Sequence, residues 1–175
     1  MRKSLSVKLA KIAIFTALIS IASPLSIPMG GGVSLSLTTF VIFIASALLP
    51  PFEALVSVAI YLLLGVIGVP IFQNFTGGFY AIVGATGGYL VGYLPATLIS
   101  GLIIRKRKTF PRYILAFSVA TLIIYALGFL WFSYVTMGEI SLGALIPSVL
   151  IFLPFDIVKI VIASLISNKL RLKLK

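Results

Sequence analysis

Long apolar segments alternate along the chain with short stretches that are basic or rich in glycine and proline. Most of these segments approach the roughly 20 residues that an α-helix needs to cross a bilayer. The first follows basic residues, as in a signal peptide, but five comparable segments come after it, so we interpret it as a retained span. The pattern predicts six membrane-spanning helices, at about residues 6–22, 37–49, 52–68, 79–104, 113–135 and 142–167.

Proline and glycine separate these segments. Pro50-Pro51 predicts a tight turn between the second and third spans, because neither proline can continue a helix. A loop rich in glycine, proline and serine, centred on Gly30–Gly32, follows the first span, and an irregular loop at residues 69–78 follows the third. The second span is short and the sixth contains two prolines, so these two are the least regular of the six.

Composition supports a membrane protein of all-α class. Hydrophobic residues make up 61% of the 175 residues and charged residues only 10%, against roughly 25% charged in an average soluble domain. Mean hydropathy is +1.23. A chain of this length cannot enclose so much apolar surface in a water-soluble core. We therefore expect residues 1–175 to form one polytopic membrane domain surrounded by lipid.

The basic residues predict the orientation of this domain. The net charge is +11, and all Lys and Arg except Lys159 fall within residues 2–11, 105–112 and 169–175. With six spans these three clusters lie on one side, and the loops on the other side contain no Lys or Arg. The positive-inside rule then places both termini in the cytoplasm, as expected of a multi-pass protein of the cell membrane. Nucleic acid is not an expected partner, because no polar face combines basic and aromatic residues.

Few residues are available for chemistry. The chain has no Cys and no His, which excludes disulfides and His or Cys metal sites, so we expect neither a metal nor a cofactor. No P-loop pattern is present, so the chain has no ATP site of its own. The three carboxylates are Glu53 at a helix start, Glu139 in an outer loop, and Asp156 in the last span.

Asp156 and Lys159 form the most informative pair. They lie at positions i and i+3 of the last span and can share one helix face. Lys159 is ten residues before Lys169, about 15 Å along the helix from its cytoplasmic end. A charge at that depth needs a partner or a water-filled cavity. A structural ion pair or a snorkelling lysine would satisfy this need, but we favour a polar anchor in a ligand cavity.

Small residues suggest close helix packing at two places. Glycines from Gly84 to Gly92 recur at short spacings in the fourth span, where they allow a helix or a ligand to approach the backbone. Ala13 and Ala17 form a small-xxx-small pair in the first span. Alanine is common in membrane helices, so the pair alone is weak evidence for a helix contact.

Several of these stretches together resemble the BioY family, the biotin-binding S components of energy-coupling-factor vitamin transporters. The clearest stretch is 61–93. It contains Gly-Val-Ile-Gly-Val-Pro-Ile-Phe at 65–72, Thr-Gly-Gly at 76–78 and Gly-Ala-Thr-Gly-Gly-Tyr at 84–89, and Asp156 and Lys159 resemble the family's Asp-x-x-Lys motif. Two departures are Thr38, where the family often has Gln, and Ala85, where it usually has Pro. The shorter Thr38 changes what that edge of a pocket can reach.

The resemblance implies an S component that binds biotin and is not an enzyme. Polar contacts would come from Asp156, Lys159, Asn74, Tyr89 and Thr38, and apolar walls from Phe72, Phe75 and Phe79. The loops around Gly30–Gly32 and at 69–78 would form a lid. Ala13 and Ala17 would pack against a transmembrane coupling subunit that works with two ATPase subunits.

Three alternatives remain open from the sequence. The chain could be an S component for a different vitamin. An intramembrane enzyme using Asp156 is disfavoured, because no second carboxylate or nucleophile–base pair is placed at membrane depth. A purely structural assembly protein is disfavoured by the Asp156–Lys159 pair.

Overall fold

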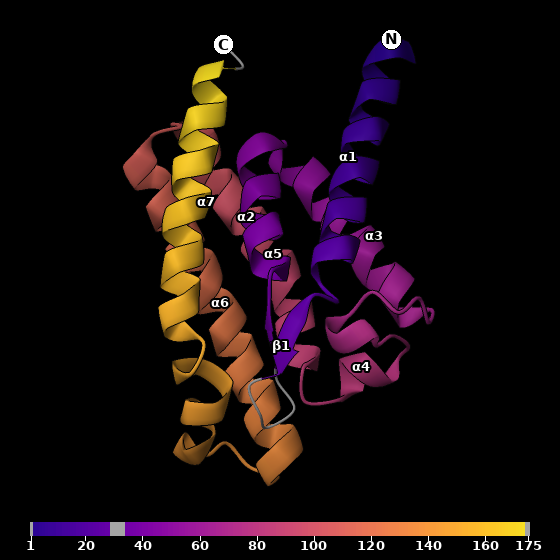
Figure 1. Cartoon of the computed structure of the whole chain (residues 1–175), viewed down its shortest axis with the longest axis vertical. Coiled ribbons are helices and arrows are strands. Elements are labelled where there is room, and N and C mark those ends of the chain that lie inside the picture. Colours follow the sequence, from indigo (N-terminus) through magenta and orange to yellow (C-terminus); the bar gives the residue numbers. More distant parts are fainter. Residues whose placement is uncertain (1, 29–33, 174–175) are drawn as a thin grey trace.

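The computed structural model describes residues 2–28 and 34–173, and the side chains of residues 5–27 and 34–170. It consists of helices and one small hairpin (Figure 1). The long elements are α1 (Arg2–Ala22), α2 (Thr38–Leu48), α3 (Pro51–Val66), α5 (Gly87–Lys106), α6 (Phe110–Met137) and α7 (Leu153–Lys173). The short ones are β1 (Ser26–Pro28), β2 (Ser34–Ser36), η1 (Gln73–Phe75), α4 (Tyr80–Val83), η2 (Leu142–Ala144) and η3 (Ile146–Leu150).

The helices are held together by a core that runs through the middle of the bundle. The most extensive helix contact is between α5 and α6, and α5 also packs against α2 and α3. Phe43 of α2 stacks on Phe117 of α6, with ring centroids 4.8 Å apart. Both rings are fully buried, so this contact connects α2 to α6 across the core although they are distant in sequence.

Apolar helices occupy all six predicted places, but their lengths differ. Within the described residues, α1, α5 and α6 are long and apolar enough to cross a membrane. The helical stretches Leu142–Leu150 and Leu153–Leu170, with a bend of 40° between them, pass the same test only when they are counted together as one span. The helices α2 and α3, of 11 and 16 residues, are shorter. The all-α membrane fold is therefore confirmed, whereas six complete crossings remain a prediction.

The turn between α2 and α3 forms as predicted. Pro50 is extended, with ψ at 145°, and Pro51 opens α3. Proline suits the first helical turn, because its fixed φ matches the helix and its missing N–H would have no partner there. Glu53 lies in the same first turn, where a carboxylate is stabilised by the helix dipole.

The fourth predicted span is not continuous. It divides into α4 and α5 at Gly84, whose backbone is extended with ψ at −176°. The indole Nε1 of Trp131 on α6 donates a hydrogen bond to the Gly84 carbonyl at 2.8 Å. The backbone N–H of Gly87 donates to the same carbonyl at 3.1 Å, so two donors hold it at the break.

The sixth span is irregular in its outer part. Residues Ile146–Leu150 form a π-helical turn, and α7 begins only after it. Pro147 and Pro154 each lie near the start of one of these two elements. Proline removes a backbone donor and disrupts the preceding helical turn, which accounts for the interruption.

The loop after the first span contains a strand pair that the sequence did not predict. β1 and β2 pair in antiparallel register, with Ser26 opposite Ser36. Figure 1 shows this hairpin below the middle of the bundle, beside the end of α1. The predicted lid around Gly30–Gly32 lies outside the described residues.

The two ends of the chain lie where an even number of crossings would place them, whereas the orientation itself stays a prediction. The start of α1 and the end of α7 lie at the same end of the molecule (Figure 1). A single cavity is lined by Lys11, by Pro50 and Pro51, and by Arg105 and Lys108. The first two basic clusters and the α2–α3 turn are therefore on one side. The predicted spans require this, because two of them separate the first cluster from the turn and two more separate the turn from the second cluster.

Candidate functional site

The charged pair of α7 lies at the centre of the candidate site. Lys159 Nζ is 2.8 Å from Asp156 Oδ1, and the side chains are only 11% and 8% exposed. The second carboxylate oxygen, Oδ2, accepts a hydrogen bond of 2.5 Å from the hydroxyl of Tyr125 on α6. Both carboxylate oxygens are thus occupied, which is how a buried charge is stabilised.

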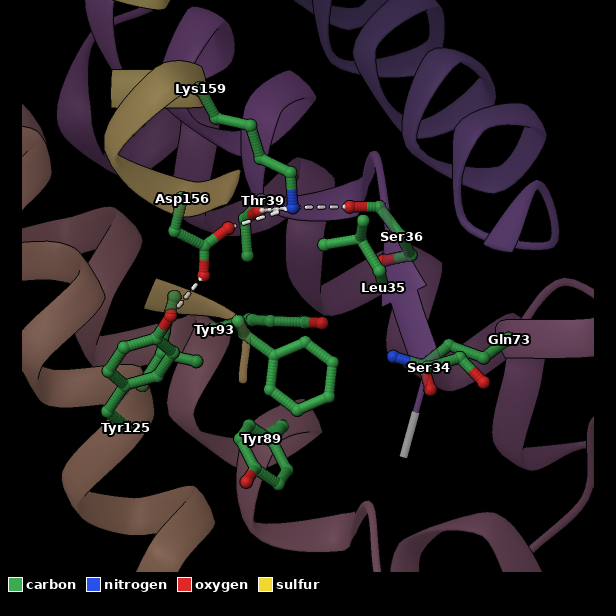
Figure 2. A pocket seen from close by; sticks show the side chains of 12 residues that line it. Ser34, Leu35, Ser36, Thr39, Gln73, Tyr89, Tyr93, Tyr125, Asp156 and Lys159 are labelled. Carbon is green, nitrogen blue, oxygen red and sulfur yellow. Dashed lines mark hydrogen bonds and ion pairs between the residues drawn. The ribbon is translucent and has the colours of Figure 1, made fainter. Parts of the chain in front are cut away.

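Lys159 connects α7 to the hairpin. Its Nζ donates to the backbone carbonyl of Ser36 on β2 at 2.7 Å and lies 3.4 Å from Thr39 Oγ1 on α2. Figure 2 shows these contacts converging on the ammonium group together with the one to Asp156. The ammonium is bound inside the protein rather than extended to the membrane surface, so the snorkelling interpretation is not supported.

The pair borders a small inner cavity that continues toward a larger outer one. The inner cavity, about 40 Å³, is lined by residues that include Ser36, Tyr125, Asp156 and Lys159. The outer cavity measures about 310 Å³. The two share the lining residues Ser34, Gln73, Tyr89 and Tyr93. A ligand that extends from the ion pair into the outer cavity would pass between these four shared residues.

Tyrosines of α5 and α6 form the apolar walls of the inner cavity. Tyr89 and Tyr93 are one helical turn apart on α5 and are 6% and 3% exposed. The Tyr89 hydroxyl donates to the Ser148 carbonyl in η3. Gly128 on α6 provides space for the Tyr89 ring, because a Cβ there would lie 2.3 Å from Cε1. These contacts fix the ring beside the polar pair.

The outer cavity has a mixed polar and apolar lining, and none of the described residues that line it is charged. Asn74, in η1, contributes to its wall and ties that loop to the hairpin. The Asn74 side chain accepts a hydrogen bond from Ser26 Oγ and donates one to Ser34 Oγ, each at 3.0 Å. Its φ of 56° is left-handed, a conformation that asparagine tolerates better than most residues.

The structure brings only part of the predicted set to the cavities. Asp156, Lys159 and Tyr89 line the inner cavity, and Asn74 and Phe72 line the outer one. Thr38 is fully buried and shares a hydrogen bond of 2.8 Å with Ser36 Oγ, but it lines neither cavity. Phe75 and Phe79 are each 66% exposed and also line neither.

The whole chain matches a known family. The model of the BioY family covers residues 1–175. The chain belongs to the BioY family.

Relatives of this BioY-family chain agree over almost its full length. The biotin transporter BioY of Thermotoga maritima is 41% identical, over 94% of this chain and 95% of the relative. A probable biotin transporter BioY of Pyrococcus horikoshii is 35% identical, over 91% and 93%. A crystal structure of the S-component for biotin from an ECF-type ABC transporter superposes with a TM-score of 0.87 at 27% identity, covering 98% of this chain and 94% of the other.

The site of this BioY-family chain contains residues that sequence reasoning missed. They are Tyr93, Tyr125, Ser36, Thr39 and Gln73, which line the inner cavity. Tyr93 carries a detectable signal, since it lies four residues after Tyr89 on the same helix face. Tyr125 and the Ser36 carbonyl carry none, because each reaches the ion pair from a remote segment.

The predicted partner face of the first helix is a groove in this BioY-family chain. Ala13 and Ala17 are exposed and line an apolar groove of about 650 Å³ between α1 and α3. Its opposite wall includes Ile60, Leu64 and Ile71. Small residues that face a groove allow another helix to approach closely.

Proposed function

We propose that this protein is the biotin-binding S component of an ECF-type uptake transporter in the cell membrane. It captures biotin from outside and delivers it inward with partner subunits. The observation that carries the proposal is the buried Asp156–Lys159 pair at the inner end of a cavity. The names of the relatives and of the superposing structure identify biotin as the ligand to test. These relatives are transporters, which disfavours the alternative of an intramembrane enzyme.

The polarity of the pair suits the ureido ring of biotin. Asp156 can accept hydrogen bonds from the ring N–H groups, and Lys159 can donate to the ring carbonyl. The pair is neutral as a unit, as is the ureido group. The carboxylate of biotin would suffer repulsion here, because Lys159 Nζ and Asp156 Oδ1 are only 2.8 Å apart.

The outer cavity suits the opposite end of the ligand. Its amide and hydroxyl groups, from Gln73, Asn74, Thr76 and Thr86, offer hydrogen bonds without a negative charge. We therefore place the valerate carboxylate there and the fused rings between Tyr89 and Tyr93. The inner cavity of about 40 Å³ has room for only a few waters, so the rings can enter only when its walls move.

Calorimetry with the purified protein in detergent tests this proposal. Biotin is expected to bind with submicromolar affinity. Asp156→Asn and Lys159→Ala are each expected to weaken binding at least about tenfold, because each leaves a buried partner unsatisfied. Glu139→Gln and Lys169→Ala change exposed groups of the same types and serve as matched controls.

Two results would contradict it at different levels. Unchanged affinity in both site variants removes the pair from the binding site. Binding of another vitamin in place of biotin retains the S-component assignment but overturns the substrate.

We further propose that the α1–α3 groove receives a helix of the transmembrane coupling subunit, which works with two ATPase subunits. Ala13→Leu and Ala17→Leu would fill the groove and are expected to abolish copurification with these subunits while biotin affinity is retained. Ala10→Leu, an exposed position on α1 that does not line the groove, is the matched control. Loss of copurification in the control variant as well would show that the groove is not the contact.

A further inference from the structure

A further cavity, which has basic residues in its lining, lies at the opposite end of the bundle from the hairpin. It measures about 520 Å³ and is bordered by α1, the α2–α3 turn, the end of α5 and the loop after it. Three of its lining residues are basic: Lys11 of α1, Arg105 of α5 and Lys108 of the loop. Segments separated by more than ninety residues in the sequence thus direct positive charge to one cavity.

These three cations have no partner among the side chains that the structure describes. Among the residues whose side chains the structure describes, none of the three takes part in a hydrogen bond or ion pair. No acidic residue lines the cavity, and Glu53, in the first turn of α3, is not part of the lining. The cavity is therefore a concentrated site of unpaired positive charge at the membrane edge.

Apart from Ser46, the remaining residues that line the cavity are apolar. Leu48, Leu49 and Ile104 border the cavity, together with Phe52, whose ring is 65% exposed. Gly101 brings the turn close to α5, since a Cβ there would lie 3.1 Å from the Cα of Pro51. The result is an apolar lining next to a cationic group of residues.

We propose that this cavity binds the phosphate headgroup of an anionic phospholipid, with its acyl chains over the apolar lining. Arg105 can hold phosphate oxygens in a bidentate manner, and the two lysines add point charges. Basic cavities between membrane helices on the cytoplasmic side are suited to anionic lipid headgroups. Basic residues that only set the orientation need no common position within a loop. Here Lys11 of one helix shares a single cavity with Arg105 and Lys108 of another segment.

The phosphate chemistry alone would also fit inorganic phosphate. A free anion would make no use of the apolar side chains, and a phospholipid satisfies both parts of the lining. A carboxylate-bearing segment of a partner protein would satisfy the charge as well, and it becomes an outcome of the test.

The test uses the purified full chain in neutral detergent. Phosphatidylglycerol, phosphatidylcholine and inorganic phosphate are added separately, and thermal unfolding and native mass spectrometry are recorded. Phosphatidylglycerol is expected to raise the unfolding midpoint and to give a saturable adduct, because a ligand that binds the folded state stabilises it. Phosphatidylcholine and phosphate are expected to do neither.

The chain offers a closely matched pair of variants. Lys11→Gln/Arg105→Gln/Lys108→Gln changes the cavity, and Lys8→Gln/Lys106→Gln/Arg107→Gln changes exposed neighbours that do not line it. Both remove three positive charges. The first is expected to weaken phosphatidylglycerol binding by about tenfold or more, and the second by less than about threefold.

Several results would overturn the proposal. One is an equal loss in both variants, which indicates diffuse electrostatics. Another is equal stabilisation by phosphatidylcholine or by free phosphate. A third is a cavity variant that keeps lipid binding but loses its partner subunits, which assigns the cavity to a protein contact. If the triple variant does not fold, Arg105→Gln/Lys108→Gln against Lys106→Gln/Arg107→Gln gives the same comparison.

Discussion

Both carboxylate oxygens of Asp156 have a partner: Lys159 contacts Oδ1, and the uncharged hydroxyl of Tyr125 donates a hydrogen bond to Oδ2. Tyr125→Phe removes the hydroxyl and keeps the ring. Because hydrogen bonds to charged groups contribute roughly 1.5–3 kcal/mol, we expect biotin affinity to fall about tenfold or more as Asp156 loses its fixed orientation. Calorimetry measures the effect.

The control for this prediction is Tyr134→Phe on the same helix, where the side chain is 65% exposed. Its affinity for biotin is expected to equal that of the unmodified protein. If Tyr125→Phe also binds biotin normally, Tyr125 does not position the carboxylate during binding.

At the residue scale, the sequence predicts what is chemically conspicuous. Asp156 and Lys159 are evident because charge in an apolar helix is costly. Tyr125 is one of several aromatic residues in apolar segments, and only its contact with Asp156 distinguishes it. Phe75 and Phe79 belong to an aromatic cluster near the predicted pocket, but local backbone geometry exposes them.

At the scale of elements, the contact between α5 and α6 depends on glycine. A Cβ on Gly88 would lie 2.3 Å from the Trp131 Cβ and 2.4 Å from the Leu127 carbonyl oxygen. Because backbone cannot yield cheaply, Gly88→Ala is expected to lower the free energy of unfolding by about 1–3 kcal/mol. Thermal denaturation followed by circular dichroism in detergent measures this loss.

Gly143→Ala provides the comparison, since the nearest atom to its added Cβ would be an ordinary 3.5 Å away. Its unfolding midpoint is expected to change little. An equally small change for Gly88→Ala would mean that α5 and α6 can separate without cost.

Element boundaries are predictable where a residue type dictates backbone geometry. Pro50-Pro51 and the basic loop mark the ends of α2, α3, α5 and α6 within a few residues. The division at Gly84 is harder to predict, since one of the donors to its carbonyl, the indole N–H of Trp131, lies 47 residues later. The hairpin depends on pairing between three-residue strands, too short for a period-two pattern to be detected.

For the whole molecule, the expected outcome is that both termini face the cytoplasm. The chain lacks cysteine, so single cysteines can be labelled without background. Lys106→Cys is expected to react with a membrane-impermeant maleimide only after cells are permeabilised. Leu142→Cys, at a position 78% exposed at the other end, is expected to react in intact cells. The reverse pattern would invert the orientation, and labelling of both in intact cells would contradict the single crossing, by α6, that separates the two positions.

The overall architecture is the part that sequence determines best, because hydropathy and charge act over the entire chain. Composition excludes a soluble fold, and the basic clusters give an orientation that Lys11, Arg105 and Lys108 support by sharing one cavity. Cavity shape is less predictable, since it arises where side chains from several helices meet.

The bond from Lys159 to the Ser36 carbonyl joins positions 123 residues apart, and its acceptor belongs to the main chain. A main-chain acceptor is present whichever amino acid is encoded at position 36. A mutational scan will therefore find Lys159 sensitive without finding a complementary substitution in the hairpin. Methods that infer contacts from paired changes among related sequences have no signal for this link, although it ties the hairpin to the last helix.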